Sequence, residues 1–373
     1  MRPIVLATHS VFTSPTTDTH GPAHSVAEYL SFHKIPYVFV KHPIVGIGAT
    51  RIERYGSLPV TPTQFWPFFG IHSFAELVTN MRVCFALRSE KPIYIGVDPL
   101  NALSGVLGKY LRWVSTIVYY TPDYTTQRFK NALVNYVYHA IDRFVALRAD
   151  QVWCVSQAIM QIRKQQSVRL GNIYHVPNSP SLRVTGHIRD DTKHPQQLVM
   201  VGNIVPTMDY TFMIDAVDHL RRTYPKLRLE IVGEGAYMNA LRQQVAHRKL
   251  TQTIHFLGQL SHTDVINLLK TSGVGIALYT GMHETNYFGD SMKIREYLAC
   301  GLPVVTTDVV ETARVVDTYH AGEIIKIRKD TLYPALKKIL DTKNYNRYVK
   351  NALRAAKVFD FDTMIAVPFR KLV

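Results

Sequence analysis

A short stretch near position 290 holds the residues best suited to chemistry in this sequence. Asp290 or Ser291 can cap the start of a helix, and Gly301 followed by Pro303 ends it. The first turn of such a helix leaves backbone N–H groups without partners and carries a partial positive charge, so it can bind an anion such as a diphosphate. We therefore expect an anion site at Ser291 and Met292.

Two charged side chains follow in the same expected helix. Lys293 would lie in its first turn, where a cation is unfavourable unless an anion binds nearby. Glu296 comes three residues later and faces the same side, and its carboxylate can accept hydrogen bonds from two ribose hydroxyls. The two side chains together could bind one nucleoside diphosphate. The alternative is an ordinary Lys–Glu ion pair on a surface helix, and spacing alone favours that alternative.

Asp123 is a second candidate for chemistry. It follows the β-branched and aromatic segment 115–120, which predicts a strand. A carboxylate placed after a strand can remove the proton from an acceptor hydroxyl. The competing interpretation is that Pro122 and Asp123 only form a turn.

Three histidines near the N-terminus are candidates for contact with a bound molecule. His9 follows the first expected strand, and His20 and His24 lie in the next loop and at the start of a helix that opens with Gly21-Pro22. Each could contact a bound molecule, and each could instead have a purely structural role.

Short apolar segments alternate with helical ones along the whole chain. The expected strands are 3–7, 36–40, 92–97, 115–120 and 151–155, then 198–201, 227–232, 254–257, 274–278 and 303–306. This alternation predicts an α/β protein with parallel sheets. Ligands of such sheets bind beyond the carboxyl ends of the strands, so functional residues are expected in the loops there.

The length of 373 residues allows two domains. Segment 177–195 carries three prolines and a polar, charged run, which is typical of a boundary. We expect an N-terminal domain at 1–182, a linker at 183–195 and a C-terminal domain at 196–355. The last residues, 356–373, are expected to pack back on the N-terminal domain.

The charge of the chain is strongly positive, at +15, and unevenly placed. Residues 1–190 carry 19 Lys and Arg against 10 Asp and Glu. Such a basic half suggests an anionic partner, namely lipid headgroups, nucleic acid or a phosphorylated substrate, although solubility alone could explain it.

An aromatic segment at 63–78 precedes several basic residues. Aromatic rings beside basic side chains suit an interface with anionic lipid, and the alternative is a helix packed on the sheet. The residues are Phe65, Trp66, Phe68, Phe69 and Phe74, followed by Arg82, Arg88 and Lys91.

The three cysteines, Cys84, Cys154 and Cys300, are far apart, with neither metal-ligand nor disulfide spacing. This fits a reducing compartment. The first residues read as a strand rather than a signal peptide, and no run of roughly 18 apolar residues predicts a spanning helix.

The C-terminal half resembles the donor-binding domain of GT-B glycosyltransferases. The resemblance rests on segments 291–293, 296–299 and 301–305, and on 201–202, 231–235, 255–258 and 273–278, which match in order. It implies an α/β GT-B fold of two Rossmann-like domains whose parallel sheets face each other across a cleft. The N-terminal domain would bind the acceptor, with His9, His20 and His24 as acceptor-side candidates. It also implies a nucleotide-sugar site at Gly202, Gly233, Gly258, Ser291, Met292, Lys293 and Glu296. Lys293 would further stabilise the leaving diphosphate, without a required metal or other cofactor.

The resemblance includes the group 1 glycosyltransferases, a large retaining family. This sequence departs from that family in two places. Phe288 stands where that family usually has a Glu, and segment 203–209 lacks its Arg and Lys. The Asp-Ser-x-Lys form at 290–293 is more similar to the membrane-associated glucuronosyltransferase of xanthan assembly, an inverting enzyme. In that enzyme an Asp after a comparable strand is the general base, which implies this role for Asp123. Retention or inversion stays open.

Asp360-Phe361-Asp362 is similar to the metal-binding Asp-x-Asp of another glycosyltransferase fold. No strand precedes it, so we expect solvated chain and no metal site.

The expected function is transfer of a hexosyl or glycuronosyl group from a nucleotide sugar to a lipid-linked or polysaccharide acceptor. This would serve cell-envelope glycan or exopolysaccharide synthesis, in the cytoplasm, peripherally at the inner face of an anionic membrane. One alternative is a GT-B sugar-nucleotide epimerase. Another is a non-enzymatic binder of nucleic acid or another anionic polymer, but no nucleic-acid-binding module is recognisable. No G-x-G-x-x-G follows the first strand, which argues against a Rossmann oxidoreductase.

Overall fold

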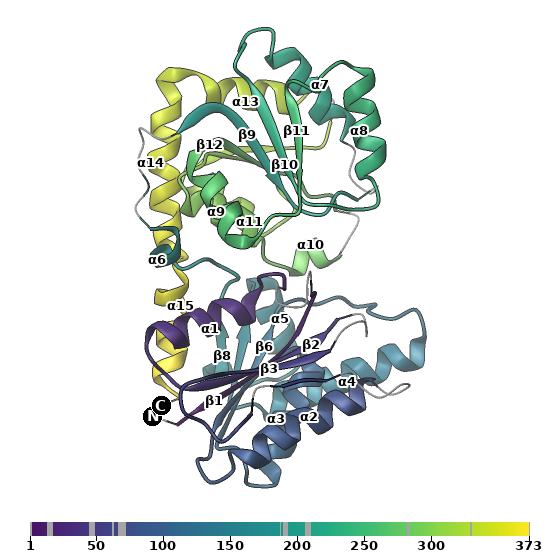
Figure 1. The fold of residues 1–373 in the computed structure, drawn as a ribbon, viewed down its shortest axis with the longest axis vertical. Helices are drawn as coiled ribbons and strands as arrows, with labels where there is room; N and C mark the ends of the chain where they lie inside the picture. The colour runs from purple at the N-terminus through teal and green to yellow at the C-terminus, as the bar shows by residue number, and fades with distance from the viewer. Residues whose placement is uncertain are drawn as a thin grey trace. The chain divides into compact units, whose positions relative to one another are not determined.

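The chain forms two compact units. The computed structural model describes residues 2–12, 18–44, 49–61, 63–65, 72–186, 188, 193–205, 210–281, 284–328 and 330–372. The first unit contains Met1–Asn178 and Phe361–Val373, and the second contains Ser179–Asp360 (Figure 1). Within these described ranges, no helix is long and apolar enough to cross a membrane.

The first unit is built on an eight-stranded sheet in the order β4-β3-β2-β1-β5-β6-β7-β8. Its strands are β1 (Ile4–Ser10), β2 (Tyr37–Pro43), β3 (Thr50–Tyr55), β4 (Thr63–Phe65), β5 (Ile93–Val97), β6 (Thr116–Thr121), β7 (Gln151–Cys154) and β8 (Ile173–His175). The strands pair in parallel except at one edge, where β3 is antiparallel to β2 and to β4.

The helices of the first unit pack on both faces of this sheet. They are α1 (Pro22–Phe32), α2 (His72–Ala86), α3 (Pro99–Tyr110), α4 (Ala132–Arg148), α5 (Gln157–Gln165) and α15 (Phe361–Arg370), with a 3-10 turn η1 (Leu170–Asn172). Figure 1 shows α1 and α15 on one face, and α2 and α3 on the other. The Phe369 ring of α15 meets the Tyr29 ring of α1 edge-on, with centroids 5.4 Å apart, and α4 packs outside α3.

The second unit is built on a six-stranded sheet in the order β11-β10-β9-β12-β13-β14, parallel throughout. Its strands are β9 (His194–Val201), β10 (Arg228–Val232), β11 (Ile254–Gly258), β12 (Ser272–Ala277), β13 (Val304–Thr307) and β14 (Gly322–Ile325). Its helices are α6 (Leu182–Thr185), α7 (Thr211–Leu220), α8 (Met238–His247), α9 (His262–Thr271), α10 (Glu284–Phe288), α11 (Met292–Ala299), α12 (Thr312–Thr318), α13 (Leu332–Leu340) and α14 (Thr342–Val358).

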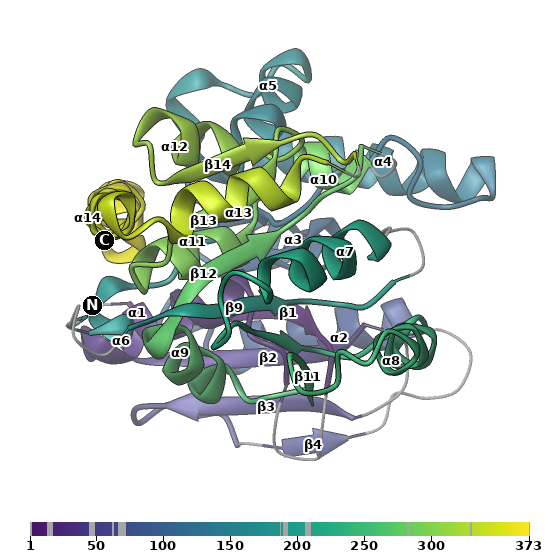
Figure 2. The ribbon, with the colours of Figure 1, turned by 90° about the horizontal axis from the view of Figure 1, so that it is seen from above.

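Two apolar clusters hold this second sheet between helical layers. One joins the strands to α7, α8 and α13, of which α7 and α13 lie side by side in Figure 2. The other joins them to α9, α11 and α12. Helix α14 contributes to both, through Tyr345 and Val349 to the first and through Ala352 and Ala356 to the second. Burial of these side chains is the main stabilising contribution.

Each sheet contains a point where the chain changes direction across it. The chain leaves β1 toward β2 and returns to β5 on the other side of β1, and it likewise leaves β9 toward β10 and returns to β12. Ligands of open parallel sheets bind beyond the strand ends at such points. The residues that follow β1, β5, β9 and β12 are therefore the first to consider as functional.

The expected parallel α/β architecture is confirmed, and two local expectations are corrected. The sequence also did not predict the antiparallel edge β3–β4, because Thr50–Tyr55 is mostly polar and lacks an apolar run. The linker expected at 183–195 is partly regular structure, since α6 spans Leu182–Thr185 and β9 begins at His194. Asp360-Phe361-Asp362 is not solvated chain: Phe361 is fully buried at the start of α15, and Asp360 accepts a 2.9 Å hydrogen bond from the Leu182 N–H.

The aromatic segment 63–78 is only partly covered by the structure. Trp66, Phe68 and Phe69 lie outside the described residues. Phe74, on α2, is exposed.

Close backbone contact fixes the turns after β9 and β10. Gly202 donates a 2.9 Å hydrogen bond to the Val232 carbonyl, and Gly233 donates one of 2.8 Å to the Gly258 carbonyl. A Cβ on Gly233, whose φ is +127°, would lie 2.0 Å from the Gly202 carbonyl oxygen. Only glycine allows these two turns to approach so closely.

Gly233→Ala should therefore destabilise the second unit by about 2 kcal/mol or more, because it combines overpacking with a strained φ. Gly281→Ala is the matched control, since a Cβ there meets nothing within 4 Å, and it should change stability by less than about 0.5 kcal/mol. Denaturant unfolding of both variants checks this. Equal stability of the two would show that the Gly202–Gly233 contact is not a constraint.

Candidate active site

In the second unit, Lys293 lies over the turn that follows β9. Its Cε and Nζ atoms are 3.0 and 3.4 Å from the point that a Cβ at Gly202 would occupy. Among the residues described, Lys293 has no hydrogen-bond or ion-pair partner. A partly buried ammonium group without a counter-charge is unfavourable, so this position suits a bound anion.

The start of α11 adds hydrogen-bond donors at the same place. Ser291 is the N-cap: its Oγ accepts a 3.3 Å hydrogen bond from the Ile294 N–H and shares one of 2.5 Å with the Tyr279 hydroxyl. The backbone N–H groups of Met292 and Lys293 find no acceptor in the described part of the chain. They point along the positive end of the helix dipole, which favours an anion.

A buried ion pair and a buried tyrosine fix α11 in this position. Asp290 forms a bidentate pair with Arg295, with Nε–Oδ2 and Nη2–Oδ1 distances of 2.9 Å, and also accepts from Thr312. The ring of Tyr297 packs where a Cβ on Gly275 would stand, and its hydroxyl oxygen accepts a 2.9 Å hydrogen bond from the Val201 N–H. Asp290 is thus a positioning residue and not the cap.

Glu296 is buried one turn along α11. Its Oε1 lies 2.8 Å from Nε2 of His262, the first residue of α9. Glu296 is 5% exposed, and it pairs with His262 and not with Lys293. The alternative of an ordinary Lys–Glu surface pair is therefore wrong. His262 was missed by sequence reasoning, because no local pattern links it to a residue 34 positions away.

In the first unit, a pocket of about 660 Å³ brings together all four sequence-predicted residues of the N-terminal half. Asp123, His9, His20 and His24 all line it. Glu76, Asp98, Arg128 and Tyr138, which sequence reasoning did not select, also line it.

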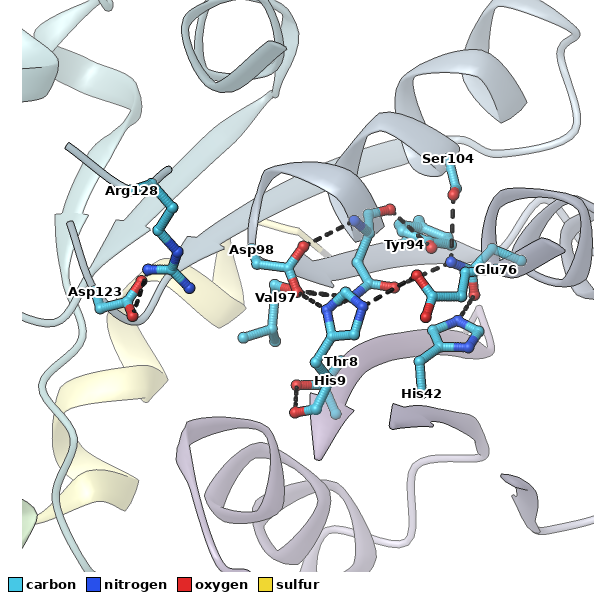
Figure 3. Close-up of polar contacts among 12 residues, drawn as sticks. Thr8, His9, His42, Glu76, Tyr94, Val97, Asp98, Ser104, Asp123 and Arg128 are labelled. Carbon is cyan, nitrogen blue, oxygen red and sulfur yellow. Dashed lines mark hydrogen bonds and ion pairs between the residues drawn. The ribbon is translucent and has the colours of Figure 1, made fainter. Parts of the chain in front are cut away.

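His9 is held between two carboxylates at the centre of this pocket. Its Nδ1 lies 2.6 Å from Asp98 Oδ2, and its Nε2 lies 3.1 Å from Glu76 Oε2 (Figure 3). Burial opposes a charge on His9, but the two carboxylates outweigh burial and raise the pKa of His9 to about 10. His9 is therefore an imidazolium at neutral pH that donates from both nitrogens, and it is not suited to act as a base.

Asp98 follows β5 in a backbone conformation that is rare for any residue but glycine. Its φ and ψ are 77° and 161°. Its carboxylate caps α3 by accepting a 3.0 Å hydrogen bond from the Asn101 N–H, and it accepts another of 2.8 Å from the Asn101 amide. Burial would raise the pKa of Asp98, but His9 and these hydrogen bonds hold it below its usual value. Strain of this kind clusters at functional sites.

A buried polar network lies beside His9, with the ring centroids of His42 and His9 5.9 Å apart. His42 contacts Thr50 at 3.0 Å and the Asn80 side-chain oxygen at 3.2 Å, and Asn80 donates to Asn101 and Ser104. Burial lowers the pKa of His42, so it is neutral beside the charged His9. Figure 3 shows His42 and Glu76 on the same side of His9, with Asp98 opposite.

Asp123 lies apart from this network. Its Oδ2 accepts a 2.8 Å hydrogen bond from Arg128 (Figure 3). Both side chains are more than a third exposed. His24 contacts Asp18 at 2.9 Å and His20 contacts Glu28 at 3.2 Å, each with one ring nitrogen. The strand-end rule would have identified Asp98, which directly follows the expected strand 92–97. Glu76 gave no such signal, because it lies inside a helix.

These two units have the GT-B fold. In each unit the candidate functional residues lie where the chain changes direction across the sheet. The chain shares this fold with the Anabaena protein HepE in complex with UDP and glucose, with a TM-score of 0.68 and 15% identity over 100% of this chain and 99% of that chain. Residues 188–355 match the family model of the glycosyl transferases group 1. The second unit therefore contains a group 1 glycosyl transferase domain, and the chain is a glycosyltransferase.

Two curated relatives match at higher identity but over less of the chain. Glycogen synthase of Mycobacterium tuberculosis is 26% identical over 324 residues, which is 86% of this chain and 70% of the relative. Chitobiosyldiphosphodolichol beta-mannosyltransferase of Yarrowia lipolytica is 26% identical over 141 residues, 37% of this chain and 30% of the relative.

We predict that Asp98→Asn lowers the pKa of His9 from about 10 toward its ordinary value of 6.5, because one of the two carboxylates becomes neutral. The charged His9 should stabilise the fold fully below about pH 6.5, and this contribution should disappear as the pH rises toward about 10. An NMR titration of the imidazole, with unfolding measured across that window, checks both statements. Asp123→Asn is the control in the same pocket and should leave the His9 titration unchanged. An unaltered titration in Asp98→Asn would contradict the assigned ion pair.

Proposed function

We propose that the chain transfers a sugar from a nucleoside-diphosphate sugar to a lipid-linked or polysaccharide acceptor in cell-envelope glycan or exopolysaccharide synthesis. The observation that carries the proposal is the unpaired Lys293 over Gly202, beside the free N–H groups of α11. No acidic side chain within the described residues satisfies this cation, so the missing partner is a ligand anion.

Each donor-site residue has a separate part in this proposal. Lys293 and the backbone N–H groups of Met292 and Lys293 bind the diphosphate and stabilise the charge that develops on it as it leaves. Glu296 binds the ribose, with its carboxylate oriented by His262. Gly202 and Gly233 let the backbone approach the ligand closely.

UDP is the first nucleotide to test. HepE, which shares the fold, is described in complex with UDP and glucose. The donor site as proposed contacts only phosphate and ribose, so it requires no particular base.

The acceptor is proposed to bind in the pocket of the first unit. Carboxylate oxygens and imidazole nitrogens that line it, from Glu76, Asp98, His20 and His24, suit the hydroxyl groups of a sugar. The two curated relatives act, by their names, on glycogen and on a dolichol-linked saccharide. A glycan or lipid-linked acceptor is consistent with both.

Asp123 is the proposed general base if the transfer inverts configuration. Both Asp98 and Glu76 are bound to His9, whereas Asp123 is the pocket carboxylate outside that network. Arg128 holds Asp123 at one oxygen only, so the other can accept the proton of an acceptor hydroxyl.

Lys293→Ala should weaken binding of UDP roughly ten- to a hundredfold but leave uridine binding nearly unchanged, because one charge-assisted contact contributes about 1.5–3 kcal/mol. Glu296→Ala should weaken both ligands, since the ribose is common to them. Lys226→Ala, an exposed lysine of the same unit, is the control. Calorimetric titration measures all three variants. Wild-type UDP affinity in Lys293→Ala would remove Lys293 from the site.

Asp123→Asn should lower turnover by roughly 10²–10⁴-fold with UDP affinity unchanged, because asparagine keeps the shape of the side chain but lacks the basic carboxylate. If Asp123 only forms a turn, the variant instead loses stability and keeps its activity per folded molecule. Initial rates at saturating donor and acceptor, together with thermal unfolding, separate the two. Turnover near that of the wild type would exclude Asp123 as the base.

A further inference from the structure

Helix α4 presents an apolar face to solvent. Leu133 and Tyr136 are 71% and 72% exposed, and Val137, Phe144 and Leu147 are also exposed. A contiguous exposed surface of this kind marks an interaction site, whereas single exposed apolar residues do not. We call these five residues the α4 apolar face.

The spacing of these residues makes the face continuous along the helix. Successive members of the face are separated by four, seven and three residues, spacings that place side chains on one side of a helix. These members are Leu133, Val137, Phe144 and Leu147. The helix is well formed at its start, since the Asn131 side chain accepts hydrogen bonds from the N–H groups of Leu133 and Val134. The face is therefore a property of a stable helix and not of a loop.

The charged side chains on and beside α4 indicate what kind of partner this face would bind. The only acidic residue of α4, Asp142, is buried against Arg163. Arg143 and Arg148 on the helix, and Lys130 just before it, are exposed. An apolar stripe flanked by cations, without exposed acids, matches an interfacial helix on anionic lipid.

We infer that the α4 apolar face docks on the surface of an anionic lipid bilayer, lying in the headgroup region without spanning it. A second copy of the chain would bring Arg143 and Arg148 against the same cations, which is unfavourable. An anionic lipid surface instead neutralises them while it covers the apolar side chains.

This inference deepens the proposed function by placing the lipid beside the acceptor pocket. Tyr138 of α4, together with Arg128 and Phe129 just before the helix, lines that pocket. A lipid-linked acceptor held in the bilayer under α4 would therefore have its sugar close to Asp123. The statement about the acceptor rests on the proposed function, whereas binding of the bilayer itself does not.

The test compares vesicle binding by two matched double variants. Leu133→Ser with Arg143→Gln should weaken binding to vesicles of phosphatidylcholine and phosphatidylglycerol roughly tenfold or more, because one apolar and one cationic contact are lost. Leu170→Ser with Arg169→Gln removes the same residue types from another exposed site of the first unit. This control should bind like the wild type. Co-sedimentation at low and high salt measures both, and binding should decrease with salt.

Three outcomes would overturn the inference. They are equal vesicle binding by the two double variants, no preference of the wild type for anionic over pure phosphatidylcholine vesicles, and self-association that the α4 variant abolishes. UDP affinity, measured on the same samples, reports separately on the donor site and confirms folding. A protein that binds UDP but not vesicles loses only the α4 inference, and one that binds vesicles but not UDP loses only the proposed function.

Discussion

Both units depend on one constraint of parallel sheets, which is that all strands end at the same edge. In each unit the chain adds strands on one side of its first strand and then returns to add strands on the other side. The loops after the two neighbouring strands at this point run in opposite directions. In the first unit these ends carry His9 and Asp98, and in the second they carry Gly202 and, beyond β12, the start of α11. Side chains that are far apart in sequence meet there because backbone hydrogen bonding brings the strands together.

The two strand-end sites differ in whether their charged side chains have partners of opposite charge. In the first unit each charged group has a partner of opposite charge, since the His9 imidazolium lies between Asp98 and Glu76 and Arg128 lies against Asp123. Such a pocket presents hydrogen-bonding groups with little net charge, which suits neutral hydroxyl groups. In the second unit the Lys293 charge has no counter-charge in the described residues, while Asp290 is neutralised by Arg295. This unpaired charge is the reason we propose that the site binds an anion.

The positions of the residues proposed for the donor site could be predicted from the sequence more readily than those of the residues proposed for the acceptor pocket. Ser291, Lys293 and Glu296 lie within six residues of one helix, so capping and helical spacing place them without knowledge of the fold. Gly202 and Gly233 were also predictable, because each ends an apolar strand. The partners His262 and Glu76 were not, since their contacts form only when separate helices pack on the sheet. Asp98 was within reach, because it follows an expected strand just as Asp123 does.

The backbone at Asp98 shows why that residue cannot be a passive part of the fold. Its φ of 77° and ψ of 161° place it in a region used almost only by glycine, at a cost of about 1–3 kcal/mol. A glycine would relieve this strain but would lose the two hydrogen bonds from Asn101, one of which caps α3, and the ion pair with His9. An apolar side chain would lose them too and would leave the imidazolium with Glu76 alone. The strain is therefore offset by contacts that only a short carboxylate can make. Because the same contacts fix the protonation and orientation of His9 in the pocket, the fold and the site share this one residue.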